Sequence, residues 1–183
     1  NNEAEDGSAL YVGNVTPRVA NNTFLSHGRQ VDAAVYFRGS RGWFTGNIVA
    51  FSLLGTRVSG STRPSADRNC YFGNAVDYEG ISPGPNDIHA DPQFLAPWVG
   101  DFHLRPTSPC IDAATNSGIL AGDTDLDGRP RIAGARADIG CFEYDGAPYL
   151  IREIAQAKAI PHAFPIALRD QVVTAAFGDG FLN

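Results

Sequence analysis

The sequence of 183 residues is poor in lysine, in charge and in cysteine, and it contains no methionine. Charged residues make up only 19% of the chain, the net charge is −6, and no basic block occurs, which argues against a nucleic-acid-binding protein. No uncharged apolar run reaches the length of about 18 residues that a membrane helix needs, so we expect no membrane span. A hydrophobic content of 43% predicts one globular domain rather than a disordered chain.

A repeat of short strand-like runs covers the first half of the chain. Each copy holds two or three runs rich in β-branched and aromatic residues, separated by Gly, Asn, Ser or Pro. Asn22, Asn47 and Asn69 recur at spacings of 25 and 22 residues. Short strands with this period are typical of a parallel β-helix, and the leucine pattern of a leucine-rich repeat is missing. We therefore predict an all-β fold, with β-helix coils over residues 1–84.

The recurring asparagines predict a structural ladder. Side-chain amides at one bend of successive coils can hydrogen-bond to one another along the axis and also cap the turn backbone. We expect Asn22, Asn47 and Asn69 to stack in this way. Because the repeat begins almost at residue 1 without a recognisable cap or leader, we also expect either a fragment of a longer β-helix or stacking against another chain.

Five short motifs follow the repeat. They read D-P-x-F, G-D-F-x-L, S-P-x-I-D-A, D-x-D-G-x-P-R and D-I-G-x-x-E, at residues 91–94, 100–104, 108–113, 125–131 and 138–143. In this order they resemble the C-terminal end of bacterial right-handed parallel β-helix repeat proteins of the choice-of-anchor type. The resemblance implies a right-handed β-helix with its C-terminal β cap in residues 85–145. It also implies a secreted, periplasmic or cell-surface location, and it implies no particular activity.

Two departures from that family pattern stand out. Ala114 occupies the place of the usual Gly after Ile-Asp-Ala, so this turn is expected to differ in shape. The anchor segment that often follows is replaced by an apolar tail, residues 146–183, which argues against membrane or wall anchoring of this chain. Pro148 and the apolar spacing after it predict a short helix at the start of an otherwise irregular tail.

The apolar tail has two interpretations. It either folds back to cap the β-helix or docks into another subunit, because such a segment would otherwise expose an apolar patch. We favour docking, since the front of the chain also lacks a cap. The candidate docking residues are Leu150, Ile151, Ile154, Phe164 and Phe177.

Asp123, Asp125 and Asp127, followed by Gly128, form a candidate calcium loop, since alternate carboxylates on a tight turn can converge on a hard cation. An EF-hand is excluded because Gly134 occupies the position of the required bidentate Glu. The alternative, which we favour, is a turn in which the carboxylates pair with nearby backbone and arginine groups. Calcium is therefore the sole cofactor that the sequence suggests.

The chain has three cysteines, so at most one internal disulfide can form. Cys110 and Cys141 hold similar places in the last motifs and are the candidate pair, with free buried thiols as the favoured alternative. The four histidines show no metal-ligand spacing, and we interpret His89 and His103 as structural hydrogen-bonding residues.

The signal for catalysis is weak. A polysaccharide lyase needs a cationic base beside a group that neutralises the substrate carboxylate. The coils contain no lysine, and their candidates, Arg38 and Arg57, have no accompanying carboxylate cluster. Asp67 and Asp77 are scattered rather than gathered on one face as in a hydrolase.

We therefore expect a non-catalytic scaffold or interaction protein that belongs to a larger assembly and has other protein chains as partners. The alternative is a carbohydrate-active enzyme, either a polysaccharide lyase or a glycoside hydrolase, or a glycan-binding module that takes a polysaccharide.

Overall fold

The computed structural model of the protein describes residues 9–25, 33–146, 149–151 and 166–168. Within these ranges the chain forms strands, turns and a short 3-10 helix, η1 (Pro97–Val99), with no α-helix. No helix in this part of the chain is long and apolar enough to cross a membrane. The prediction of an all-β fold is confirmed.

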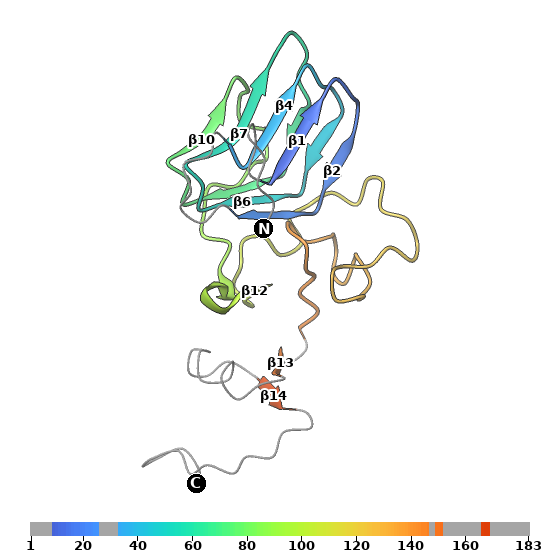
Figure 1. Ribbon diagram of the computed structural model, residues 1–183. Helices are drawn as coiled ribbons and strands as arrows, with labels where there is room; N and C mark the ends of the chain where they lie inside the picture. The colour runs from blue at the N-terminus through green and yellow to red at the C-terminus, as the bar shows by residue number, and fades with distance from the viewer. Residues whose placement is uncertain (1–8, 26–32, 147–148, 152–165, 169–183) are drawn as a thin grey trace.

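The first ten strands form three parallel sheets (Figure 1). The sets β1–β3, β4–β6 and β7–β9 each supply one strand to every sheet, and each such set is called a coil below, whereas β10 adds a fourth strand to the first sheet alone. The first sheet has the order β1-β4-β7-β10, with bounds Leu10–Gly13, Val35–Arg38, Leu54–Ser59 and Val76–Glu79. The second has the order β2-β5-β8, with bounds Arg18–Ala20, Trp43–Thr45 and Ser65–Asp67. The third has the order β3-β6-β9, with bounds Thr23–Leu25, Ile48–Ala50 and Cys70–Phe72.

The pairing register follows the period seen in the sequence. In the third sheet Phe24 pairs with Val49, and Val49 pairs with Tyr71, which are the same offsets that separate the three asparagines. These side chains and those of Phe37 and Phe44 fill the space between the sheets. The Phe37 and Phe44 rings are fully buried and meet edge to face, with centroids 5.4 Å apart. Burying each ring contributes about 2 kcal/mol.

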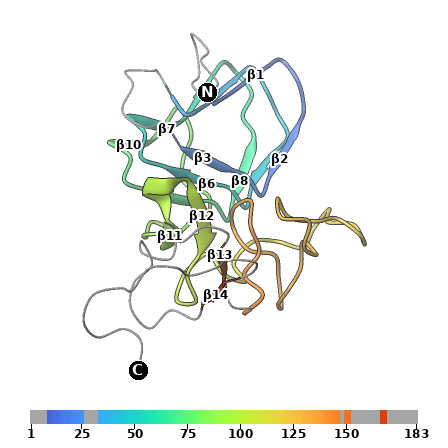
Figure 2. The ribbon, with the colours of Figure 1, turned by 60° about the horizontal axis from the view of Figure 1, so that its bottom comes forward.

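The outer face of the third sheet is also buried. Because side chains alternate along a strand, Val49 points into the coil, whereas Ile48 and Ala50 point outward. Several of their outer partners, including Cys110 and Ile139, come from residues 105–146, which are called the C-terminal segment below. The predicted capping segment therefore packs along the side of the coils, where Figures 1 and 2 show the yellow and orange chain.

A glycine permits one of these close approaches. Gly140 donates its N–H to the Gly46 carbonyl at 2.8 Å, and it has a φ of +108°. A Cβ added at Gly140 would come within 2.7 Å of Ile48 Cδ1, so no larger residue fits there without a shift. Ala114, which stands where the resemblance predicts Gly, is fully buried in the same cluster.

After the coils the chain forms an antiparallel hairpin of β11 (Phe94–Ala96) and β12 (Asp101–Leu104), joined by η1. Beyond the hairpin, residues 105–146 contain turns and no strand. The last described elements, β13 (Tyr149–Ile151) and β14 (Ile166–Leu168), pair in parallel.

The predicted helix after Pro148 is wrong at its first residues. Tyr149–Ile151 form a strand, because an aromatic residue, a leucine and a β-branched residue in succession suit a strand that finds a partner. That partner, β14, lies too far along the chain to be seen in local spacing. Of the candidate docking residues, Leu150 and Ile151 belong to β13, whereas Ile154, Phe164 and Phe177 lie outside the described residues.

Candidate functional site

The three asparagines are joined by hydrogen bonds from coil to coil. Asn22 Nδ2 donates to Asn47 Oδ1 at 3.1 Å, and Asn47 Nδ2 donates to Asn69 Oδ1 at 3.0 Å. The same two oxygens also accept the backbone N–H groups of Asn22 and Asn47, each at 3.0 Å. Asn47 and Asn69 are completely buried, so each amide satisfies backbone groups that water cannot reach.

Asp87 ends the ladder. Its Oδ1 accepts the backbone N–H of Asn69 at 2.8 Å and the Asn69 side-chain amide at 3.3 Å. A carboxylate accepts hydrogen bonds but has no donor to pass to a further coil. Asp87 was not among the predicted ladder residues, although it precedes Ile88 as Asn47 precedes Ile48.

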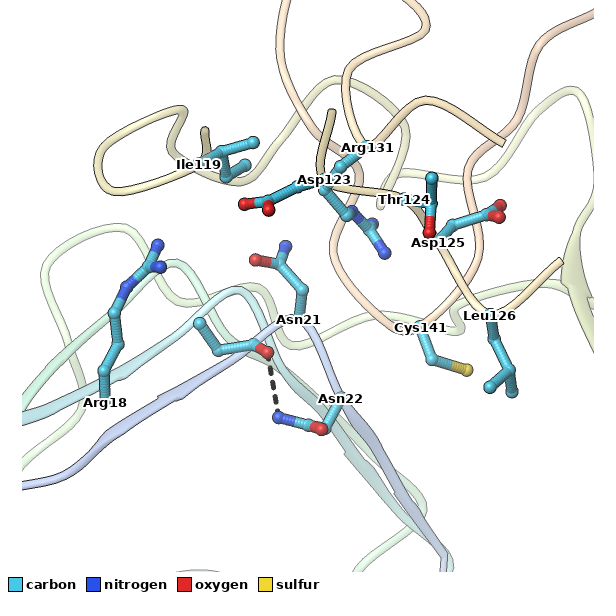
Figure 3. A pocket seen from close by; sticks show the side chains of 11 residues that line it. Arg18, Asn21, Asn22, Ile119, Asp123, Thr124, Asp125, Leu126, Arg131 and Cys141 are labelled. Atoms are coloured by element: carbon cyan, nitrogen blue, oxygen red, sulfur yellow. Dashed lines mark hydrogen bonds between the residues drawn. The ribbon is translucent and has the colours of Figure 1, made fainter. Parts of the chain in front are cut away.

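A polar pocket of about 380 Å³ lies between the coils and the C-terminal segment (Figure 3). It brings together several candidates that are far apart in the sequence. Its lining includes Arg18, Asn21, Asn22, Asp123, Asp125 and Cys141. Figure 3 shows Arg18 and Asn21 on the coil side, facing the strand-free segment that carries Asp123.

Hydrogen bonds across this pocket join its two walls. Arg18 donates to the carbonyl oxygens of Gly118 at 2.6 Å and Ser117 at 2.5 Å. Asn21 Nδ2 donates to the Asp138 carbonyl at 3.0 Å. These contacts connect residues about a hundred positions apart, so they hold the C-terminal segment against the first coil.

The carboxylates of the candidate calcium loop are engaged by different donors. Asp123 Oδ2 accepts the Leu120 N–H at 2.8 Å, and Asp125 Oδ1 accepts the N–H groups of Asp127 and Arg129 at 2.9 and 2.8 Å. Asp127 Oδ2 lies 2.9 Å from His103 Nε2. In the described ranges, no group of three or more His, Cys, Asp or Glu side chains is arranged to hold a metal ion. The geometry is that of a turn capped by its own carboxylates.

Cys110 and Cys141 are both free thiols, so the candidate disulfide does not form and the cysteines follow the favoured alternative of free thiols. Cys110 faces the core beside Cys70, whereas Cys141 lines the polar pocket and donates its N–H to Thr23 Oγ1 at 3.2 Å. A hydrogen bond with Cys110, together with burial, raises the pKa of Cys70, and burial raises the pKa of Cys141. The thiols of Cys70 and Cys141 therefore stay protonated and act as small apolar side chains.

A buried charged network adjoins the pocket, because Arg131 belongs to both. Arg131 forms an ion pair with Glu143, whose side chain is fully buried, and donates to the Asp138 carbonyl at 3.2 Å. The Asp138 carboxylate accepts the N–H groups of Asp112 and Tyr144, both at 2.7 Å. Burial raises the pKa of Asp138, and it raises the pKa of Glu143 to about 7. These motif carboxylates replace the regular hydrogen bonding that residues 105–146 lack.

His103 bridges two carboxylates at the edge of the same segment. Its Nδ1 lies 2.7 Å from Asp101 Oδ1 and its Nε2 lies 2.9 Å from Asp127 Oδ2, while its ring stacks on Phe142 at 3.9 Å. Burial alone would lower the pKa of His103, but the hydrogen bonds with both carboxylates outweigh it and raise the pKa. A protonated His103 donates to both carboxylates and so ties the hairpin to the turn at Asp127.

His89 makes a similar but more exposed bridge. Its Nδ1 lies 3.1 Å from Asp77 Oδ2, and its Nε2 lies 3.3 Å from the Tyr78 hydroxyl, which donates to Asp87 Oδ2 at 2.8 Å. This chain of contacts links the last strand of the first sheet to the end of the asparagine ladder.

The raised pKa values predict that the fold is more stable in mild acid. Glu143, with a folded pKa of about 7 against an ordinary 4.5, contributes stability below its unfolded pKa that is lost as the pH rises through 7. His103 acts in the same direction above its ordinary value of 6.5. We expect the free energy of unfolding to fall by about 2 kcal/mol between about pH 5 and about pH 8. Urea unfolding followed by circular dichroism at a series of pH values measures this.

The matched control is the double variant Glu143→Gln, His103→Gln. It removes both titrating groups and keeps polar side chains, so its stability should change much less over the same pH range. A wild-type stability that rises toward pH 8, or a double variant with an unchanged slope, contradicts the prediction.

The arginines considered for lyase chemistry lie on the outer face of the first sheet. Arg57 forms an ion pair with Glu79, with Arg57 Nε 2.8 Å from Glu79 Oε1, and its guanidinium lies 5.8 Å from the Tyr36 ring centroid. Arg38 pairs with Ser59 in the β4–β7 register and is exposed. Asp77, the other acidic residue considered in this region, lies with its Oδ2 3.1 Å from His89 Nδ1 and is therefore engaged by a histidine.

Comparison with protein-family models, curated proteins and solved structures finds no match. The resemblance to choice-of-anchor proteins therefore depends on the motif residues alone.

Proposed function

We propose that the protein is a non-catalytic scaffold of the right-handed parallel β-helix kind, related to the choice-of-anchor proteins and acting outside the cell or at its surface. Three parallel sheets with one strand per coil support this architecture. The asparagine ladder and its end at Asp87 supply further support, because they satisfy the buried bends of successive coils. The motif residues resemble those of the same family.

A role in binding, with no chemical step, is supported by what the polar side chains do. Arg18 and Asn21 are used to attach the C-terminal segment, and Asp123 and Asp125 cap turns. Arg131 and Glu143 neutralise each other. Each group thus has a structural partner that explains its presence.

The proposed interaction is supported above all by the first sheet, which has two unpaired edges in the described chain. In the described chain, β1 and β10 are its two edge strands, each paired on one side. Edge strands present N–H and C=O groups to which a strand of another chain can add. Val76 in β10 is also 52% exposed, which places an apolar side chain on that edge. We therefore propose other protein chains as partners.

The native mass tests this proposal. Light scattering of the purified protein, with mass spectrometry of every chain present, should give a mass well above 19.5 kDa. Val76→Lys should lower that mass, because a charge on the edge strand opposes strand addition. The matched control is Leu126→Lys, at a side chain that is 73% exposed on a turn. A monomer at all concentrations, or equal effects of the two variants, would overturn the proposed assembly.

A further inference from the structure

A second pocket, of about 400 Å³, lies between the third sheet and the β11–β12 hairpin. Aromatic side chains form one part of its lining and planar polar side chains form the other. The residues that matter for its chemistry are Phe51, Phe72, Trp98, Asp91, Gln93 and Arg105. Its volume is within the range of small-molecule binding sites.

Phe51 occupies a backbone position that favours glycine. It follows β6 with a φ of +57°, and the residue in the equivalent place after β9 is Gly73, with a φ of +66°. A left-handed conformation is unfavourable for a bulky residue, whereas glycine adopts it without steric conflict. The fold can therefore make this turn with glycine, yet the second coil places a phenylalanine there. Strain of this kind is typical of binding sites.

The strained turn places an aromatic surface on the pocket. The Phe51 and Phe72 rings meet edge to face with centroids 5.7 Å apart. Gly73 permits this arrangement, since a Cβ there would lie 3.0 Å from Phe51 Cδ1. Trp98, on η1, lines the pocket from the hairpin and is 62% exposed, so a large aromatic side chain is presented to solvent at its rim.

The polar side chains of the pocket are held by local hydrogen bonds. Asp91 Oδ1 accepts the Gln93 N–H at 2.7 Å, and Gln93 Oε1 accepts from the Thr107 hydroxyl at 2.5 Å. Arg105 donates to the Leu95 carbonyl at 3.1 Å, and its buried Nε has no hydrogen-bond partner. Gln93 also has a φ of +54°, so a second residue of the lining is held in a left-handed conformation.

We propose that this pocket binds a saccharide, with one sugar ring stacked on the aromatic surface and its hydroxyl groups bonded to Asp91 and Arg105. The C–H face of a pyranose carries partial positive charge and suits the negative face of an aromatic ring. Carboxylate and guanidinium groups offer paired acceptors and paired donors, which match vicinal hydroxyl groups. The opposite charges of Asp91 and Arg105 favour a neutral sugar over a polyanion. This site is independent of the edge strands that carry the proposed assembly.

The experiment uses the full chain and isothermal titration with neutral gluco-, manno- and galacto-oligosaccharides and with oligogalacturonate. We expect saturable binding of a neutral oligosaccharide, and weaker binding of the uronate. Trp98→Ala and Arg105→Met should each lower the affinity about tenfold or more. Phe51→Gly installs the residue that the next coil uses at this turn, so it should lower affinity while the circular dichroism spectrum stays that of the wild type.

Trp43→Ala is the matched control, because Trp43 is the other tryptophan, is 57% exposed and lies in β5, outside this pocket. It should leave the affinity unchanged. Absence of binding to every oligosaccharide overturns the inference, as does an equal loss of affinity in the Trp43 and Trp98 variants. Stronger binding of the uronate overturns the preference for a neutral sugar. None of these results depends on the native mass, so the two proposals fail separately.

Discussion

Glu143→Ala should lower the free energy of unfolding by about 4 kcal/mol, the largest effect we expect from a single substitution. The Glu143 side chain is fully buried and forms an ion pair with Arg131, which is itself 6% exposed. Truncation leaves the buried guanidinium without its carboxyl partner. It also removes the acceptor of the Asp138 N–H, now 2.9 Å from Glu143 Oε1. Urea unfolding followed by circular dichroism measures the loss.

Two further variants distinguish the stability effect of the buried ion pair from that of an exposed ion pair. Replacing both partners, as Arg131→Met with Glu143→Leu, should recover a large part of the stability, because no unpaired charge remains. Glu79→Ala breaks the ion pair with Arg57, in which the Glu79 side chain is 56% exposed, and should cost less than about 1 kcal/mol. A Glu143→Ala variant no less stable than Glu79→Ala would contradict this account of the network.

Asn47→Ala should cost about 3 kcal/mol, because it removes the middle member of the ladder. The Asn47 amide donates to the Val19 and Thr45 carbonyls at 3.0 and 3.2 Å, and its oxygen accepts the Asn22 N–H. All three groups would lose a partner around a residue that is 0% exposed. Chemical unfolding of the variant and the wild type under the same conditions gives the difference.

Asn47→Asp tests whether the ladder needs the side-chain N–H donor of its middle residue. The new side chain can still accept from Asn22, but it has no N–H for Asn69 Oδ1. It should therefore also be clearly destabilising. The control is Asn86→Ala, an exposed asparagine whose side chain donates to Asp67 at 3.0 Å, and its effect should be within about 0.5 kcal/mol. Equal stabilities of the Asn47 and Asn86 variants would show that the stacked amides contribute little.

The repeat and the strand register could be predicted from the sequence because both depend on the number of residues in one coil. A parallel coil must return to the same place after each turn, so strand offsets appear in the sequence as a period. The spacing of Asn22, Asn47 and Asn69 thus anticipated the pairing of β3, β6 and β9. The ladder was predicted for the same reason. Its last member, Asp87, was not predicted, because a carboxylate there interrupts the run of identical residues.

The tail helix was wrong, and the candidate disulfide, the less favoured alternative for the two cysteines, does not form. Each was inferred from similar position or spacing alone. Cys110 and Cys141 hold similar places in two motifs, yet one faces Cys70 in the core and the other faces the coil at Thr23. Tyr149–Ile151 have an apolar spacing that also suits a helix, and a distant strand decided the outcome.

The sequence by itself determined an all-β chain with strands that recur once per coil, because periodic side chains and turn residues act over a few positions. The tertiary structure decided where the β11–β12 hairpin and the C-terminal segment lie against the coils, and therefore both pockets. Arg18 meets Gly118, and Gly140 meets Ile48, across about a hundred residues of chain. Such contacts depend on the shapes of two folded surfaces, and no local spacing encodes them.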